Sequence, residues 1–427
     1  MRGTVPRPND VEPGMRLGCL LVAAALVSSA CAADDDQGSA DPTGRGPGTV
    51  PPPDVERAAV DGDAPVEALA AGFNGAGFDL LRGQPAEENA VFSPSSIGNA
   101  LLMARAAADP DTAAAIDAKF RLPDASHEAW NAIDQQMAAA QGDELTVTVA
   151  DRIWPREGVE PDPDWLDLLG AYHGAGVEPL DLAGDPAGSR ERVNGWVDEQ
   201  TDGLIPELLP EGFIRPETVL LLTDALYFKA RWERTFGKYG PVDGTFTRLD
   251  GSTVDVEFLR ELELADRRGQ GDGFVGAEIP YVGGEFSMLV IVPDEGRFAD
   301  LRDGLDQDFL DEVDASFTTG PYELLLPRWE TTTQLDLLGW LEEAGVAPGS
   351  FPAISPDAFL GGAVHGADIA VDEWGTVAAA ATGLGFEESG PPEPELVVAA
   401  DQPFLYFIRH RDSGLVLFAG QVTDPTM

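Results

Sequence analysis

The stretch Val371-Asp-Glu-Trp-Gly375-Thr376-Val-Ala378-Ala-Ala-Ala381-Thr382-Gly383 joins an acidic turn to a run of small residues near the C-terminus. An alanine run of this kind has good helix propensity but no amphipathic stripe. A segment that must enter between two existing β-strands, in contrast, needs slim side chains on both of its faces. The stretch therefore predicts a loop that can become a strand.

Composition excludes several classes of function. The chain has 427 residues, with 27 Lys and Arg against 75 Asp and Glu, which gives a formal net charge of -48. Nucleic acids and anionic lipid surfaces would be repelled by such a chain, so we expect no nucleic-acid partner. Hydrophobic residues make up 43% of the chain, which is enough for a packed core.

The first residues are typical of a secretion signal. Residues 17–27 are apolar, follow three arginines and lead into small residues that end at Cys31. Eleven or so apolar residues are too few to span a bilayer, so we interpret residues 1–31 as a signal peptide. The residues 28–31 that follow the apolar stretch resemble a bacterial lipobox, although Ser28 stands where a Leu or Val is usual. This resemblance predicts lipid attachment at Cys31. Secretion without a lipid is the alternative. Met1 and Met15 are both possible starts, and either predicts a bacterial extracellular or cell-surface protein.

Beyond Cys31 the sequence divides into a linker and a body. Residues 32–65 are rich in Asp, Gly and Pro, which predicts a disordered spacer with a reach of roughly 30 Å as a coil and about 100 Å when extended. Residues 66–427 contain no cysteine and mix helical with strand periodicity, which predicts one α+β domain. Helices are expected at 66–81, 95–107, 128–140 and 189–200, and strands at 145–153, 218–229, 288–293, 323–326, 404–410 and 416–421. The long apolar strands indicate a large sheet that is covered on one face.

Several of these segments resemble motifs of the serpin family, in the family order. Residues 89–101 are similar to its first strand and helix B, residues 193–205 to helix F, residues 223–232 to central strand 3 of sheet A, and residues 401–410 to a closing strand. The resemblance implies a serpin fold with a large, mostly antiparallel sheet A, two further sheets, about eight to nine helices and an exposed reactive loop. It also implies a single-use inhibitor of serine proteases, monomeric and without a cofactor: the protease cleaves the loop, and insertion of the loop into sheet A traps the acyl-enzyme.

The resemblance assigns the opening stretch to the hinge of the reactive loop. The implied hinge residues are Glu373, Gly375, Thr376, Val377, Ala378, Ala379, Ala380, Ala381 and Thr382. On insertion, the even-numbered residues from Thr376 to Thr382 would face the core, and all of them are small. Trp374 and Val377 stand where the family usually has acidic residues, from which we expect slower insertion at most.

The family loop lengths leave the cleaved bond open. A count of seventeen residues from Glu373 puts the cleaved residue at Ser389, followed by Gly390, and a count of sixteen puts it at Glu388. The surrounding residues contain no Lys or Arg, and the pocket of a trypsin-like protease needs a cation. The expected partner is therefore an elastase-like or subtilisin-like serine protease.

Five residues are implied to lie where sheet A opens: Ser93, Ser96, Asp224, His365 and Trp232. Without the resemblance, the serines would be read as helix caps, Trp232 as a core residue and His365 as a structural histidine. Asp224 replaces the asparagine of the family. We therefore expect a contact between Asp224 and His365 that raises the pKa of the histidine.

Two other classes of function compete with inhibition. An enzyme is disfavoured because no Gly-x-Ser-x-Gly, His-Glu-x-x-His, Ser-x-x-Lys or P-loop motif occurs and the four histidines are scattered. Acidic pairs such as Asp162 and Asp164 lack the spacing of a calcium loop, so no metal site is expected. The remaining alternative is a non-inhibitory serpin-fold protein that acts in binding or as a chaperone-like surface protein.

Overall fold

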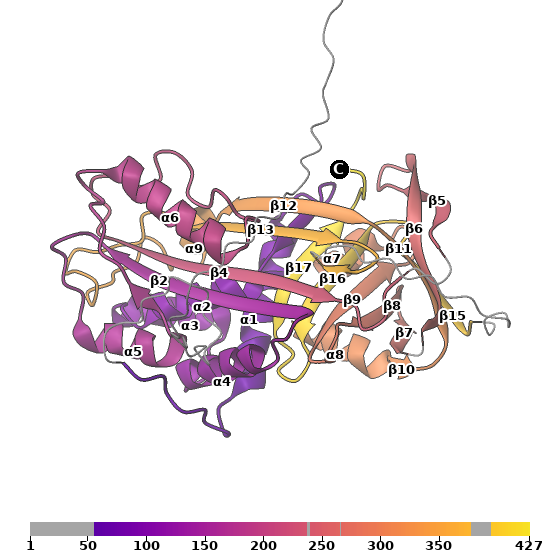
Figure 1. Cartoon of the computed structure of the whole chain (residues 1–427), viewed down its shortest axis with the longest axis horizontal. Coiled ribbons are helices and arrows are strands. Elements are labelled where there is room, and N and C mark those ends of the chain that lie inside the picture. The colour runs from indigo at the N-terminus through magenta and orange to yellow at the C-terminus, as the bar shows by residue number, and fades with distance from the viewer. Residues whose placement is uncertain (1–54, 237–239, 265, 377–393) are drawn as a thin grey trace, which may run out of the picture. The chain divides into compact units, whose positions relative to one another are not determined.

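The structure, a computed structural model, describes residues 55–236, 240–264, 266–376 and 394–427 (Figure 1). The described residues form nine helices: α1 (Val66–Gly83), α2 (Pro94–Arg105), α3 (Pro110–Phe120), α4 (Ser126–Ala139), α5 (Pro163–His173), α6 (Pro186–Gln200), α7 (Phe298–Asp303), α8 (Gln307–Ser316) and α9 (Leu338–Glu343). None of these helices is long and apolar enough to cross a membrane.

The described strands form three sheets. The six-stranded sheet has the order β12 (Trp329–Asp336), β13 (Val364–Val371), β14 (Gly375–Thr376), β4 (Leu220–Arg231), β2 (Leu145–Pro155) and β3 (Gly176–Val177). The seven-stranded sheet has the order β1 (Ala90–Phe92), β17 (Val416–Val422), β16 (Phe404–His410), β9 (Phe286–Pro293), β8 (Phe274–Pro280), β7 (Arg267–Gly271) and β10 (Thr318–Thr319). The four-stranded sheet has the order β15 (Leu396–Ala399), β11 (Tyr322–Pro327), β6 (Thr253–Leu264) and β5 (Val242–Thr247). The expected α+β architecture with three sheets is confirmed.

Helix starts follow local sequence signals. Ser93 caps α2 by accepting a hydrogen bond from the backbone N–H of Ser96, and Pro94 occupies the first helical position. Helices α3, α5 and α6 begin in the same way, with an aspartate cap followed by proline. A side-chain oxygen at the cap satisfies an otherwise unbonded N–H, and proline at the first position has no N–H to satisfy.

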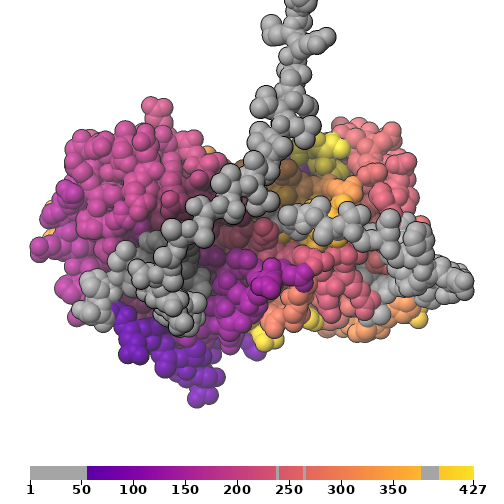
Figure 2. Space-filling view, viewed as in Figure 1, coloured from indigo at the N-terminus to yellow at the C-terminus, as the bar shows by residue number. Residues whose placement is uncertain are grey.

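The six-stranded sheet is covered on both faces where α6 crosses it, which corrects the expectation of one covered face (Figure 1). On one face, Trp154 of β2 and Trp196 of α6 pack edge to face at 5.5 Å within a small apolar cluster. On the other face, Leu226 and Phe228 of β4 belong to the main core. In the space-filling view, the magenta residues around α6 lie on the left and the salmon residues around β5 and β6 on the right (Figure 2).

The end of the predicted linker differs from the expectation. Arg57 lies within residues 32–65, yet its guanidinium donates to Asn131 Oδ1 at 2.7 Å and to the backbone oxygen of Tyr172 at 3.0 Å, and it pairs with Asp134. The backbone N–H of Ala58 donates to the oxygen of Ala171 at 2.9 Å. Residues 57 and 58 are therefore attached to α4 and α5, because the guanidinium of Arg57 and the backbone N–H of Ala58 form hydrogen bonds with these helices.

Candidate functional site at the hinge and sheet opening

The hinge predicted from the sequence begins as a short strand inside the six-stranded sheet. Strand β14 pairs antiparallel with β13, with Val371 opposite Thr376, and antiparallel with β4, with Thr376 opposite Ala230. Thr376 is 2% exposed, and its hydroxyl is 2.6 Å from the hydroxyl of Tyr281. The side chain of Thr376 thus faces the core, as predicted for the even-numbered hinge residues.

At Gly375 the backbone of β4 leaves no room for a side chain. A Cβ atom on Gly375 would stand 2.0 Å from the backbone oxygen of Ala230 and 2.8 Å from the Cα of Arg231. Neither backbone atom can rotate away, so this position accepts only glycine.

The turn between β13 and β14 is held by its own carboxylates. Asp372 Oδ1 accepts hydrogen bonds from the backbone N–H groups of Trp374 at 2.7 Å and Gly375 at 3.1 Å. Glu373 accepts from Arg328 at 2.8 Å, and the guanidinium keeps the pKa of Glu373 below its usual value. The predicted hinge residue Glu373 therefore stabilises the turn, and the small residues Gly375 and Thr376 that follow it lie in the sheet as β14.

Trp232 lies beside this turn, at the top of the sheet opening where the sequence placed it. Its indole N–H donates to the backbone oxygen of Asp372 at 2.9 Å, and its ring stacks on Tyr281 with centroids 4.5 Å apart. Trp232 is 1% exposed. It therefore ties the start of the hinge to the core beneath it.

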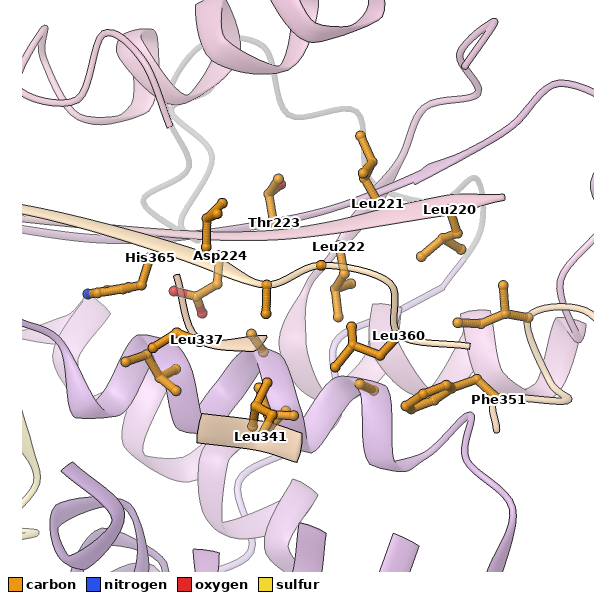
Figure 3. Close-up of a pocket in the computed structure, with 18 of the residues that line it drawn as sticks. Leu220, Leu221, Leu222, Thr223, Asp224, Leu337, Leu341, Phe351, Leu360 and His365 are labelled. Carbon is orange, nitrogen blue, oxygen red and sulfur yellow. The ribbon is translucent and has the colours of Figure 1, made fainter. Parts of the chain in front are cut away.

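Below β14, the sheet has an opening between β4 and β13. Within the described residues, the only strand that pairs with both of them is β14, which contributes two residues, and no direct pairing of β4 with β13 occurs. A cavity of about 190 Å³ lies at this opening, with leucine side chains from both sides and from α9 in its wall (Figure 3). In Figure 3, Leu220, Leu222 and Asp224 point from one face of β4 and Leu221 and Thr223 from the other. We call the space between β4 and β13 below β14 the slot.

The structure brings the four polar residues predicted for this opening together at the slot. Ser96 Oγ donates to Asp224 Oδ1, and the backbone N–H of Ser93 donates to Nε2 of His365 at 2.9 Å. The side chains of Asp224 and His365 both line the slot. These residues link α2 to one strand on each side of the slot.

The predicted contact of Asp224 with His365 is wrong. In the part of the chain that the structure describes, the carboxyl of Asp224 bonds to Ser96, Asn99 and Asp151, whereas His365 Nε2 accepts from a backbone N–H. Burial lowers the pKa of His365 to about 4 instead of raising it. A neutral ring that accepts a backbone hydrogen bond cannot also take up a proton at that nitrogen without losing the bond.

Sequence reasoning missed a buried polar network behind Asp224. Asn99 of α2 donates to both oxygens of Asp151, at 3.1 and 3.0 Å, and to Asp224 Oδ2 at 2.7 Å. His173 Nδ1 lies 2.7 Å from Asn99 Oδ1, and His127 Nδ1 lies 2.8 Å from His173 Nε2. The only signal in the sequence was Asp151, which lies in the alternating strand 145–153 at a position that the alternation predicts to be buried.

Some predicted positions lie outside the described residues. These are the hinge residues Val377 to Thr382, the candidate cleavage residues Glu388, Ser389 and Gly390, and Cys31.

The described fold has a six-stranded sheet in which β13 and β4 are joined only through the two-residue strand β14. Residues 73–425 match the family described as Serpin (serine protease inhibitor). The chain belongs to the serpin family.

Relatives match over most of their own length. The chain is 31% identical to Serpin-Z2A of Oryza sativa subsp. japonica over 405 residues, which covers 81% of this chain and 93% of that protein. It is 29% identical to leukocyte elastase inhibitor A of Rattus norvegicus, with 79% of this chain and 93% of that protein covered. Among solved structures, the thermophilic serpin tengpin in its native state has a TM-score of 0.76 at 22% identity and covers 87% of this chain and 96% of its own. That last likeness concerns the fold alone.

Proposed function

We propose that the chain inhibits serine proteases as a single-use suicide substrate, by cleavage of its loop within residues 377–393 and insertion of the loop into the six-stranded sheet. One observation carries the proposal. Gly375 and Thr376 already pair with both neighbouring strands as β14, while no described residue forms a strand in the slot below them, where a cavity lies.

The register of β14 supports insertion along the slot. Thr376 lies opposite Val371 of β13 and Ala230 of β4. If β14 continued in this register for six more residues, residue 382 would lie opposite His365 of β13 and Asp224 of β4. Between Thr376 and this point the sequence offers only Val and Ala, none of which is charged or too large for the slot.

Insertion would release enough free energy to trap a protease. A strand of roughly ten residues between two partners adds about ten backbone hydrogen bonds, each contributing about 1 kcal/mol net. The total is comparable with the stability of an ordinary domain, about 5 to 15 kcal/mol. The intact protein would then be metastable and held by a kinetic barrier.

The target class follows from residues near the candidate cleavage sites. Residues 386–391 read Phe-Glu-Glu-Ser-Gly-Pro and contain no cation for a trypsin-like pocket. Two relatives, leukocyte elastase inhibitor A of Rattus norvegicus and leukocyte elastase inhibitor of Bos taurus, are named for an elastase, which supports an elastase-like target. A subtilisin-like protease is the other target proposed from the loop sequence.

Incubation with elastase-like, subtilisin-like and trypsin-like proteases tests this function. We expect an SDS-resistant complex with one of the first two, and a released C-terminal peptide whose mass places the cut at Glu388 or Ser389. Cleavage without a covalent complex for every protease in the set would contradict inhibition.

A non-inhibitory binding role is the second candidate, because the fold is shared with thyroxine-binding globulin in complex with thyroxine (TM-score 0.73, 21% identity) and the cavity at the slot is apolar. Thermal unfolding before and after a single cut in the loop separates the two roles. A large rise in the unfolding temperature after cutting indicates insertion, and an unchanged temperature indicates a passive loop.

We also propose export of the protein and lipid attachment at Cys31, on the sequence of residues 1–31. Mass spectrometry of the N-terminal peptide from membranes tests this proposal. A lipid-modified Cys31 as the first residue supports it, and an unmodified cysteine within a longer N-terminal peptide contradicts it.

A further inference from the structure

Two carboxyl groups face each other behind the slot. Asp151 of β2 and Asp224 of β4 are direct partners across the two strands, and their side chains are hydrogen-bonded to each other. A hydrogen bond between two carboxyls requires a proton on one of them. The pair therefore holds at least one proton wherever this bond exists.

The direction of the hydrogen bonds behind the pair is fixed. Asn99 uses its amide N–H groups on the two carboxyls, so its Oδ1 must accept from His173 Nδ1–H. The other nitrogen of neutral His173 then accepts from His127 Nδ1–H. Burial keeps the pKa of both histidines below the usual value, to about 4 for His127. Neutral donors thus point from α4 and α5 toward the carboxyl pair.

Other charged groups act on this network from the packed elements. Asp134 of α4 raises the pKa of both carboxyls, while Arg57 lowers the pKa of His173 and Arg105 that of His127. His365 of β13 lies across the slot and is neutral because of its burial. The side chain of Arg152 bonds to Glu178 and stacks on Trp154 of β2 and Trp196 of α6.

Burial accounts for most of the cost of charging the pair. It raises the pKa of Asp151, which is 3% exposed, and the charge of Asp224 raises it further. Burial also raises the pKa of Asp224 to about 6. Asp224 lines the cavity at the slot and a second, smaller cavity that His365 also lines. A strand that filled the slot would remove the remaining space for water beside Asp224 and further disfavour its ionised form.

We propose that Asp151 and Asp224 form a proton-dependent latch: the pair takes up a proton when a strand enters the slot, so that insertion is favoured at mildly acidic pH. This inference rests on the proposed insertion of the loop. Near pH 7 the intact protein would carry one proton on the pair, and the inserted form would carry two.

The test measures proton uptake when the loop is cut. A subtilisin-like or elastase-like protease cuts the intact protein in weak buffer at pH 7.0, mass spectrometry confirms a single cut within residues 377–393, and a pH-stat counts the protons. After the cut, the wild type should take up close to one proton per molecule more than Asp224→Asn, because the carboxylate of Asp224 gains a proton on insertion and the amide that replaces it in the variant cannot. At pH 5.0 the difference should vanish, since Asp224 is already neutral there.

Matched variants locate the proton. Asp151→Asn should keep the uptake, because the amide replaces the carboxyl that is already protonated in the intact pair, and Asp224 still takes up the second proton on insertion. Asp243→Asn removes one exposed carboxylate on β5 and should behave as wild type. His365→Gln should also keep the uptake. Equal uptake by wild type and Asp224→Asn, or uptake that disappears with His365→Gln, would overturn the latch.

Failure of insertion itself is recognised separately. If cutting raises the unfolding temperature in neither protein at either pH, the proposed function and the latch both fall. A rise in unfolding temperature without extra proton uptake overturns the latch and leaves the inhibitor proposal standing.

Discussion

At the residue scale, Gly375 sets how closely the hinge approaches β4. We expect Gly375→Ala to push β14 out of the sheet, because its Cβ would lie 2.0 Å from the backbone oxygen of Ala230. The rate at which the cut protein becomes heat-resistant should fall at least tenfold. The rate is measured by withdrawing samples after cutting and heating them.

Gly195 offers a matched control in the middle of α6. A Cβ atom there meets nothing within 4 Å, so Gly195→Ala should leave the rate unchanged and raise stability by about 0.5 to 1 kcal/mol. Equal rates for the wild type and Gly375→Ala would mean that β14 does not limit insertion.

At the element scale, the segment before α1 is attached to α4 and α5 through Arg57. Its side chain is 17% exposed and pairs with Asp134, which is 20% exposed. Replacing Arg57 by Ala removes charge-assisted bonds to α4 and α5 and should cost about 1.5 to 3 kcal/mol of unfolding free energy. Urea denaturation of the intact protein measures the loss.

Glu56→Ala serves as the control for this prediction, because Glu56 is exposed beside Arg57. It should change the free energy of unfolding by less than about 0.5 kcal/mol. A loss for Arg57→Ala as small as that for Glu56→Ala would show that the side chain of Arg57 does not stabilise the attachment of the segment.

At the scale of the whole molecule, the four histidines make the intact protein sensitive to acid. Burial depresses the pKa of His127 and His365 to about 4, that of His173 well below its usual value, and that of His410 below its usual value as well. The unfolded chain binds these protons from about pH 6.5 downward and the folded chain does not. Their contribution to stability is therefore present above pH 6.5 and is lost as the pH falls toward 4.

His365→Gln should flatten this dependence. Glutamine cannot be protonated but can still accept the hydrogen bond from the backbone N–H of Ser93. The loss of stability from pH 6.5 to pH 4 should shrink by about 3 kcal/mol relative to wild type, as followed by urea denaturation at several pH values. An unchanged slope would place the acid sensitivity in the other three histidines. The carboxyl pair acts with the opposite sign, because a raised carboxyl pKa adds stability as the pH falls.

Local periodicity was enough to predict many elements. The expected helix at 66–81 is α1 (Val66–Gly83), and the expected strands at 404–410 and 416–421 are β16 and β17. Strand β13, which forms one wall of the slot, was not predicted, because Val364–Val371 contains small and polar residues that carry little strand signal. Strand β13 pairs with β12, which lies more than twenty residues earlier in the chain, and with β14, which follows it after a turn. The first pairing leaves no local signal in the sequence.

The sequence by itself determined the family, the small residues of the hinge and the position of Thr376 on the core-facing side of β14, since these depend on residue type and on a period of two along a strand. Only the tertiary structure decided that Asp224 bonds to Asp151 and Asn99 instead of His365. The reason is physical: the partner of a buried carboxyl is set by which strand and helix lie against it, and no spacing in the chain records that the strand with Asp151 pairs with the strand with Asp224 in this register.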